Sequence, residues 1–307
     1  MDQNAALRRK PYAAHLESLD RACRWLAVGQ GRAKRYSQLV REFFEEGKRS
    51  REHILCHNES CEIVDLYELW EANVDSFPGL RRKFTTVFKK GPLLREDENP
   101  TQSTNRPRND AFGYLVAGRL LAAGVDVVAV DGIISRNVTC QSEADLTFAW
   151  DGTFIDIECK RPQTVAALRE RSEEAREQIM CSSRGGRVGV IAIDCSAFVR
   201  PGGVLLKSVL GEATGRSIFG VLEKAVGAVV TPYLTDSIPG FILFARVPSM
   251  TRVGRSLIVS PQGEPIYQLR PDSISTWLVV GNSDYKGPDV LRSIFRRIRE
   301  SARRAES

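Results

Sequence analysis

The sequence predicts an α/β protein in which a mixed β-sheet core, flanked by helices, follows an α-helical N-terminal region. Two observations carry this prediction. Apolar residues recur at helical spacing through about the first 100 residues, where no stretch alternates as a strand does. Beyond a polar segment, the patterns change to a helix, a short strand, a β-hairpin, a second helix and a buried strand. We therefore expect a helical region over residues 1–100 and an α/β domain over residues 101–307.

The N-terminal helices are expected where apolar side chains return every three or four residues. One set precedes a Gly-Gln-Gly break near residue 30 and a second set follows it: Leu16, Leu19, Cys23, Leu26 and Ala27, then Leu39, Val40, Phe43 and Phe44. Two further helices are expected around residues 63–74 and 80–88. Residues 95–110 are polar, contain two prolines and show no periodicity, which is typical of a domain boundary.

Beyond the boundary, Asn109 or Asp110 can cap a helix that ends near Gly124. A short strand is expected over residues 125–130, a helix over 164–181 and a buried strand over 187–194. The later patterns indicate a helix over 211–231, strands at 241–247 and 277–280, a small strand pair at 257–259 and 266–269, and an arginine-rich helix over 289–304. That last helix is either a surface for a partner or for DNA, or a soluble cap.

A hairpin between the first short strand and the second helix organises this part of the chain. Asp151-Gly152 lies between two alternating runs, and Asp-Gly is a strong signal for a two-residue turn because both central residues need positive φ. This turn predicts that Leu146 faces Ile157 and that Asp145 falls directly opposite Glu158. The two carboxylates are then cross-strand neighbours.

Side chains alternate between the faces of a strand, so the hairpin has an apolar face and a polar face. The polar face carries Asp145, Thr147, Asp156, Glu158 and Lys160. Directly opposed like charges destabilise an antiparallel pair, so two neighbouring carboxylates call for a cation, and a hard divalent metal fits. Asp156 lies nearer the turn and is expected at the rim. The alternative is an ordinary hairpin with a charged outer face.

An Asp followed by Glu-x-Lys on the next strand resembles the pattern of the PD-(D/E)XK, or restriction-endonuclease-like, nuclease superfamily. The resemblance implies that Mg²⁺, with Mn²⁺ as a substitute, is held by Asp145, Glu158 and the carbonyl of Cys159, while Lys160 orients or activates the attacking water. It also suggests Gln178, on the following helix, as a polar group near the site; a solvent-facing glutamine is the alternative. The similarity covers roughly residues 106–195 and includes an ECKRP strand end found in an uncharacterised bacterial group.

One position departs from the family pattern. Members commonly carry a Glu on the first helix that points into the site, whereas Gly113, Tyr114 and Leu115 hold the inward positions here. The acid nearby is Asp110, one turn earlier. It either contributes through water or simply caps the helix.

The resemblance implies a Mg²⁺-dependent endonuclease that hydrolyses phosphodiester bonds in nucleic acid, with DNA favoured over RNA. A role in bacterial restriction, anti-phage defence or repair, and a homodimer or partner subunit, are further implications. The alternative is a catalytically inactive protein of the nuclease fold that binds nucleic acid or acts as a scaffold, which the missing first-helix Glu favours. A helical regulatory protein with a charged hairpin is a third interpretation.

Composition agrees with a nucleic-acid partner. The formal net charge is +6 and the pI near 9.0, which favour an anionic partner. No run approaches the ~18 apolar residues of a membrane span, and the N-terminus lacks the apolar region of a signal peptide, so a cytoplasmic location is expected. Seven scattered cysteines are typical of a reducing compartment rather than a disulfide framework.

Two features of the N-terminal region allow two interpretations each. His53, Cys56, His57 and Cys61 form H-x2-C-H-x3-C, which is either a zinc site or, as we favour, a packed cysteine with surface or helix-end histidines. A second, basic stretch either contacts phosphates or is a solvated helix face; it comprises Arg81, Arg82, Lys83, Lys89, Lys90 and Arg95.

Overall fold

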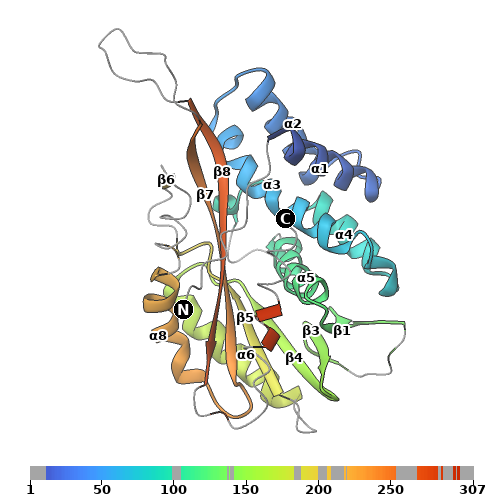
Figure 1. The fold of residues 1–307 in the computed structure, drawn as a ribbon, viewed down its shortest axis with the longest axis vertical. Helices are drawn as coiled ribbons and strands as arrows, with labels where there is room; N and C mark the ends of the chain where they lie inside the picture. Colours follow the sequence, from blue (N-terminus) through green and yellow to red (C-terminus); the bar gives the residue numbers. More distant parts are fainter. Residues whose placement is uncertain are drawn as a thin grey trace.

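The computed structural model describes residues 12–98, 105–136, 138, 142–182, 188–199, 206–208, 218, 220–253, 268–282, 285, 293, 294, 296 and 297. Within them, a mixed β-sheet is flanked by helices on both faces, and the N-terminal helices lie together beside one face (Figure 1). The predicted α/β class, with a helical N-terminal region, is confirmed.

Four helices make up the N-terminal region: α1 (Tyr12–Trp25), α2 (Arg32–Glu45), α3 (Arg51–Trp70) and α4 (Leu80–Lys89). Short 3-10 turns at Val74–Ser76 and Arg95–Asp97 follow α3 and α4. The Ser50 hydroxyl accepts a hydrogen bond from the His53 backbone N–H and so caps α3. The described residues 12–98 contain no strand, as the helical periodicity predicts.

Helix α5 (Arg106–Ala122) begins earlier than the sequence suggested. Asn105 occupies the cap position and Pro107 lies in the first turn, where its fixed φ suits a helix and its missing N–H is not needed. The prediction that Asn109 or Asp110 caps this helix is therefore wrong, and both lie inside it. The end is as predicted, with Gly124 at φ 72° just beyond Ala122.

The sheet has eight strands: β1 (Asp126–Val130), β2 (Ile133–Ile134), β3 (Leu146–Trp150), β4 (Thr153–Lys160), β5 (Val188–Asp194), β6 (Leu206–Ser208), β7 (Gly240–Val253) and β8 (Gln268–Gly281). Their order is β2-β1-β3-β4-β5-β7-β6, and β8 pairs with β7. Strands β1, β3 and β4 are antiparallel, whereas β4, β5 and β7 are parallel. Helix α6 (Val165–Ser182) connects β4 to β5. The expected order of elements is confirmed, with β2 as an addition.

The second half of the chain is described in part. The strands expected at 241–247 and 277–280 belong to one long antiparallel hairpin, β7 and β8. Of the helix expected over 211–231, the structure describes a π turn at Leu222–Val226, α8 (Gly227–Val230) and a 3-10 turn at Thr231–Tyr233. Residues 257–259, 266 and 267, and most of 289–304, lie outside the described residues.

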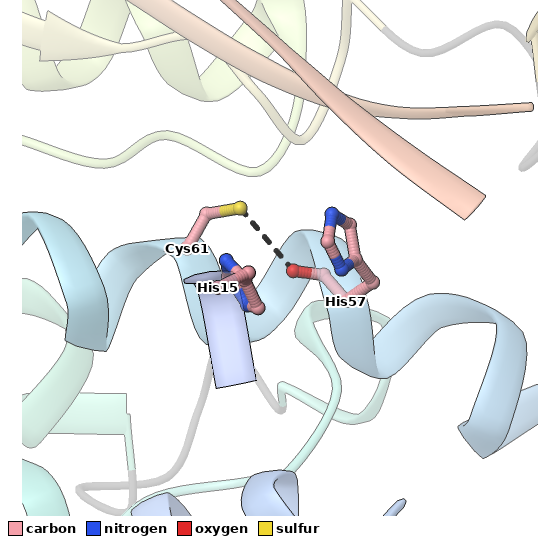
Figure 2. A group of neighbouring side chains, drawn as sticks. All are labelled: His15, His57 and Cys61. Atoms are coloured by element: carbon pink, nitrogen blue, oxygen red, sulfur yellow. Dashed lines mark hydrogen bonds between the residues drawn. The ribbon is translucent and has the colours of Figure 1, made fainter. Parts of the chain in front are cut away.

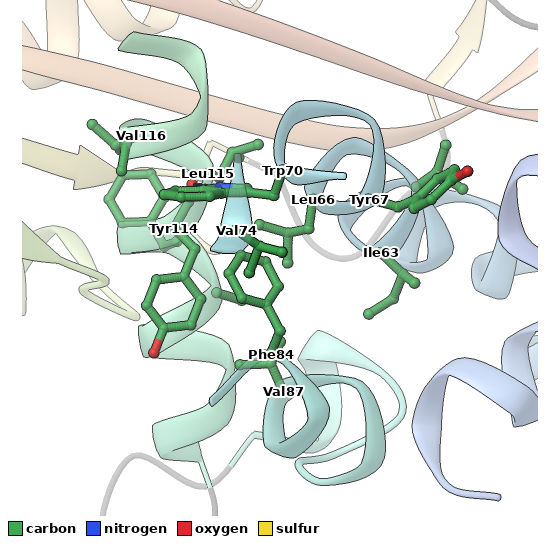
Figure 3. Close-up of a cluster of buried hydrophobic side chains, with 14 of the residues drawn as sticks. Ile63, Leu66, Tyr67, Trp70, Val74, Phe84, Val87, Tyr114, Leu115 and Val116 are labelled. Carbon is green, nitrogen blue, oxygen red and sulfur yellow. Dashed lines mark hydrogen bonds between the residues drawn. The ribbon is translucent and has the colours of Figure 1, made fainter. Parts of the chain in front are cut away.

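One hydrophobic cluster joins the helical region to the sheet. Side chains of α3, α4 and α5 converge around Trp70, Phe84 and Tyr114 (Figure 3). The Trp70 indole N–H donates to the Tyr114 carbonyl at 2.8 Å, and a Cβ at Gly118 would lie 2.7 Å from that indole nitrogen, so α3 and α5 pack closely. A second cluster, with Leu168 of α6, lies on the opposite face of β5. The sheet end that carries the predicted site thus lies between α5 and α6.

Candidate active site

The hairpin that carries the predicted site has the expected turn and register. Asp151 and Gly152 have φ values of 47° and 76°, as the two-residue turn requires. Leu146 pairs with Ile157 and Thr147 with Asp156. The next position of this register brings Asp145, just before β3, beside Glu158 of β4.

The carboxyl groups of Asp145 and Glu158 are linked through each other's backbone. Asp145 Oδ2 accepts the Cys159 backbone N–H at 2.8 Å. The Glu158 carboxylate is in turn stabilised by the Asp145 backbone N–H. Glu158 is 5% exposed, whereas Asp145 is exposed to solvent, so one acid lies inside the protein and the other at its entrance.

The pKa values reflect this crowding. Burial, together with the Asp145 charge, raises the pKa of Glu158 to about 7. Partial removal of the Asp145 carboxyl group from water also raises its pKa, although the residue as a whole remains exposed. A bound cation would relieve the repulsion between these two negatively charged carboxylates.

Lys160 lies beside Glu158 and is held by α6. Its Nζ lies 3.3 Å from Glu158 Oε2 and 3.6 Å from Glu174 Oε1, and it donates to Gln178 Oε1 at 2.5 Å. The Lys160 side chain is 11% exposed. Gln178 is exposed to solvent, as the alternative expects, and its side-chain oxygen also contacts Lys160 at the edge of the site.

Cys159 contributes its backbone to the site and its side chain to the packing. Burial raises the pKa of the thiol well above its usual range, so the sulfur stays protonated. The side chain lies near Gly113 of α5, where a Cβ would be 4.0 Å from the Cys159 sulfur. Because the N–H and C=O of a strand residue point to the same side, the Cys159 carbonyl faces the same side as the N–H bound by Asp145.

Asp156 does not lie at the rim, as the sequence suggested. It is 1% exposed and accepts a hydrogen bond from the Thr147 hydroxyl at 2.5 Å. The physical reason is that β4 is an inner strand, paired with β3 on one side and β5 on the other, and α6 packs across this face.

A second group of acids borders the site, and sequence analysis identified only one of them. Asp131, after β1, pairs with Lys83 at 2.5 Å and accepts the Tyr114 hydroxyl at 2.8 Å. Burial and the charge of Asp131 raise the pKa of Asp110 to about 6, with a smaller contribution from Asp145. The Asp110 carboxyl group is thus close enough to Asp131 and Asp145 to feel their negative charges. The signal for Asp131 was a second Asp-Gly pair, Asp131-Gly132, directly after a predicted strand.

A buried network of ion pairs extends from this strand end into the N-terminal helices. Arg161, next to Lys160, contacts Asp194 at 3.1 Å and Glu98 at 3.0 Å. Arg95 contacts the same Asp194 at 2.7 Å. Arg108 contacts Glu98 at 3.5 Å, and it also contacts Glu59 of α3 at 2.8 Å. The Arg161 side chain is therefore fixed on the side of the strand end that faces the helical region.

The charge balance of this network accounts for its burial. Four cations and four anions take part: Arg32, Arg95, Arg108 and Arg161, with Glu59, Glu62, Glu98 and Asp194. Their side chains are between 0% and 10% exposed. Opposite charges in equal number offset the cost of removing each from water.

The cations of the expected basic face contact different acidic partners in the fold. Arg81 pairs with Asp75, Lys83 with Asp131, and Arg95 belongs to the buried network. The stretch therefore forms neither a continuous phosphate-contacting face nor a wholly solvated one, because the fold supplies acids to three of its cations.

A cavity of about 470 Å³ lies at the start of α2, and none of its lining residues belongs to the carboxylate site. Arg32, Lys34 and Arg35 line it, together with the Gly-Gln-Gly loop. Arg32 is 3% exposed and pairs with Glu62, yet its Nε and one terminal nitrogen make no hydrogen bond. The cavity lining therefore combines three cationic side chains, two of them paired with acids, with unsatisfied donors of Arg32, which an anion can satisfy.

The four residues of the H-x2-C-H-x3-C pattern do not gather at one point in the structure. His53 bonds Glu42 and Ser50, and Cys56 is buried with its thiol toward the His53 carbonyl, as the packing interpretation expects for the cysteine. His57 is only 8% exposed, so its expected surface position is wrong. The reason is that α1 packs against this side of α3.

No family model, curated protein or solved structure matches this chain. Among the described residues, no helix has both the length and the apolar character needed to cross a bilayer.

The donor set of the carboxylate site fits Mg²⁺. Asp145 and Glu158 offer carboxylate oxygens and Cys159 a carbonyl oxygen, and the exposed side of Asp145 leaves room for the waters that Mg²⁺ retains. Burial and the neighbouring Asp145 charge raise the pKa of Glu158, and a cation bound between the two acids would offset the repulsion between them.

In the metal-free protein, we expect the free energy of unfolding to fall as pH rises from about 4.5 to about 7. The pKa of Glu158 rises from 4.5 to about 7 on folding, so the folded state holds the proton more tightly in this window and loses that advantage above it. The full effect is on the order of 3 kcal/mol. Asp110, with a pKa of about 6, acts in the same direction.

Urea unfolding at about pH 5 and about pH 8, in EDTA, measures this dependence. Glu158→Gln should remove most of the slope, whereas Glu143→Gln, which alters an exposed acid nearby, should leave it unchanged. If the ionised pair binds Mg²⁺, addition of Mg²⁺ should restore stability above about pH 7. An equal slope in Glu158→Gln would contradict this assignment.

Proposed function

We propose that this chain is a metal-dependent phosphodiesterase, an endonuclease of the PD-(D/E)XK type that hydrolyses phosphodiester bonds in nucleic acid, DNA in preference to RNA. The observation that carries the proposal is the meeting of Asp145, Glu158 and Lys160 at one end of the hairpin. Mg²⁺ is the proposed cofactor, with Mn²⁺ as a substitute.

Each group has a proposed role. The Asp145 and Glu158 carboxylates and the Cys159 carbonyl hold the ion. Bound there, Mg²⁺ would supply stabilisation of the charge on the phosphoryl oxygen and would lower the pKa of the attacking water. Lys160, with its ammonium beside Glu158, orients the attacking water and stabilises the developing negative charge. Gln178 fixes the position of that ammonium group.

The rival proposal is a protein of the same fold that binds nucleic acid without cleaving it. Its support is the first helix, α5, where members of that superfamily commonly carry a Glu: here Gly113 holds one of the inward positions and lies against Leu146 and Cys159 of the hairpin. Asp110 and Asp131 weaken this argument, since both place negative charge near Asp145. In either case, bacterial restriction, anti-phage defence or repair is the setting that the resemblance implies.

Incubation of the purified full-length chain with plasmid, linear duplex, single-stranded DNA and RNA tests the two proposals. Each substrate is combined with Mg²⁺, Mn²⁺ or EDTA. Cutting that requires a divalent ion supports the nuclease, and cutting at paired positions on duplex DNA supports a dimer. Binding without cutting under every condition supports the scaffold, and neither binding nor cutting contradicts both.

The cavity at the start of α2 is the proposed contact for a phosphate group of the nucleic acid. We expect Lys34→Ala to weaken DNA binding about 5-fold at moderate salt and to lower the slope of log affinity against log salt by about one. Fluorescence anisotropy in EDTA, which prevents cleavage, measures both. Lys224→Ala, which removes an exposed cation outside the cavity, is the matched control. Equal losses in the two variants would show that the cavity makes no specific contact.

A further inference from the structure

A group of metal-ligating side chains lies between α1 and α3, away from the carboxylate site. His15 comes from α1, and His57 and Cys61 come from α3 (Figure 2). One potential ligand atom of each lies within 4.8 Å of the others. This is the one such His, Cys, Asp or Glu group found within the part of the chain that the structure describes.

The spacing on α3 suits a shared ion. Residues four apart lie one above the other on one face of a helix, so His57 and Cys61 project toward the same point. The two histidine rings lie with centroids 4.4 Å apart, which brings the α1 side chain over the same face. Three potential ligands from two helices thus lie close to one point.

Two hydrogen bonds of Ser60 indicate which ring nitrogen of His15 carries the hydrogen. The Ser60 hydroxyl donates its single hydrogen to the His57 carbonyl at 2.9 Å. Ser60 Oγ can then only accept from His15 Nε2, which lies 2.7 Å away. With the proton on Nε2, the lone pair of His15 is on Nδ1. A metal-ligating histidine typically has this arrangement, with the other ring N–H held by a protein oxygen.

We propose that His15, His57 and Cys61 bind one Zn²⁺ ion, with water as the fourth ligand. Imidazole and thiolate favour Zn²⁺ over Mg²⁺, which prefers oxygen. On binding, the Cys61 thiol gives up its proton to solvent and its contact with the His57 carbonyl at 3.3 Å, and the sulfur bonds the ion. The ligand atoms draw closer, since Zn–N and Zn–S bonds are about 2.0–2.3 Å long.

The role of this ion is to join α1 to α3. Helix α3 also packs on α5 and supplies Glu59 and Glu62 to the buried network, so an ion here stabilises the helical region that lies behind the catalytic site. The proposal does not depend on the nuclease proposal, because none of its three ligands belongs to the carboxylate site.

Titration of the metal-free full-length chain with Co²⁺ tests the site. We expect one sulfur-ligated Co²⁺ per chain, with a sulfur-to-cobalt charge-transfer band in the near ultraviolet that Zn²⁺ abolishes by displacement. Cys61→Ser should remove this band and weaken Zn²⁺ binding at least about 10-fold. His57→Gln should weaken binding to a similar degree. Saturation with Zn²⁺ should raise the melting temperature of the unmodified chain but not that of Cys61→Ser.

The chain offers matched controls for each ligand type. Its third histidine, His53, bonds Glu42, so His53→Gln should leave cobalt binding intact. Cys181→Ser, which removes an exposed thiol, and Asp145→Ala, which disables the carboxylate site, should keep the band. Circular dichroism confirms that Cys61→Ser is folded. The proposal is overturned if the unmodified chain gives no sulfur-to-cobalt band, or if the band persists in Cys61→Ser.

Discussion

Asp145→Asn is expected to lower the rate of metal-dependent cleavage by at least about 100-fold while leaving DNA binding intact. The amide oxygen still accepts the Cys159 N–H, so the hairpin end keeps its geometry and only the negative charge is lost. With one carboxylate of the pair neutral, the proposed site should bind Mg²⁺ more weakly. The measurement is the initial rate of plasmid cleavage against Mg²⁺ concentration.

Lys160→Ala separates the proposed role of Lys160 in orienting water from the proposed role of Asp145 in binding the metal. It is expected to lower the cleavage rate to a similar degree but to keep Mg²⁺ binding, since Lys160 is not a ligand. Glu143→Gln, which neutralises an exposed acid two residues before Asp145, is the control and should cleave at the normal rate. Isothermal titration with Mg²⁺ distinguishes the two variants. If Asp145→Asn and Lys160→Ala both retain full activity, the catalytic assignment is wrong.

Arg108→Met is expected to destabilise the fold by about 4 kcal/mol, the largest effect on stability that we predict. The Arg108 side chain is 0% exposed, and it contacts Glu59 at 2.8 Å and Glu98 at 3.5 Å. It also donates to the Leu93 carbonyl at 2.7 Å and to the Tyr36 hydroxyl at 2.9 Å. Removal of the guanidinium therefore leaves buried carboxylates without their counter-ion.

Urea unfolding of the variants measures this effect. Arg108→Lys should recover little of the loss, because an ammonium group cannot contact acids and carbonyls in several directions at once. Arg106→Ala, an exposed change on the same helix, should cost less than about 0.5 kcal/mol. The effect should also change little with salt, since the network is shielded from mobile ions. A loss below about 1 kcal/mol would show that water replaces the arginine.

Local patterns predicted the parts of this fold that neighbouring residues decide. The turn at Asp151-Gly152 and the pairing of Thr147 with Asp156 follow from positive φ at two positions and from the alternation of strand side chains. The start of α5 was missed because Asn109 and Asp110 are good caps in isolation, whereas the helix begins at Arg106 and Pro107 suits its first turn.

The other errors concern residues whose environment comes from distant parts of the chain. Asp156 has the sequence context of a rim residue, but β5 and α6 bury it. His57 belongs to a local four-residue pattern, yet its neighbours in space are Cys61 and, from another helix, His15. Asp131 was not identified because its partner Lys83 is 48 residues away.

The sequence by itself determined the class of fold, the hairpin with its register, and thereby the pairing of Asp145 with Glu158, because turn chemistry and side-chain alternation act over a few residues. Only the tertiary structure decided which charges are buried together: the contact of Lys160 with Gln178, the position of Asp131 near Asp110, and the arginine network behind the strand end. Burial and charge compensation depend on which helices and strands meet in space, and residue spacing along the chain does not specify that.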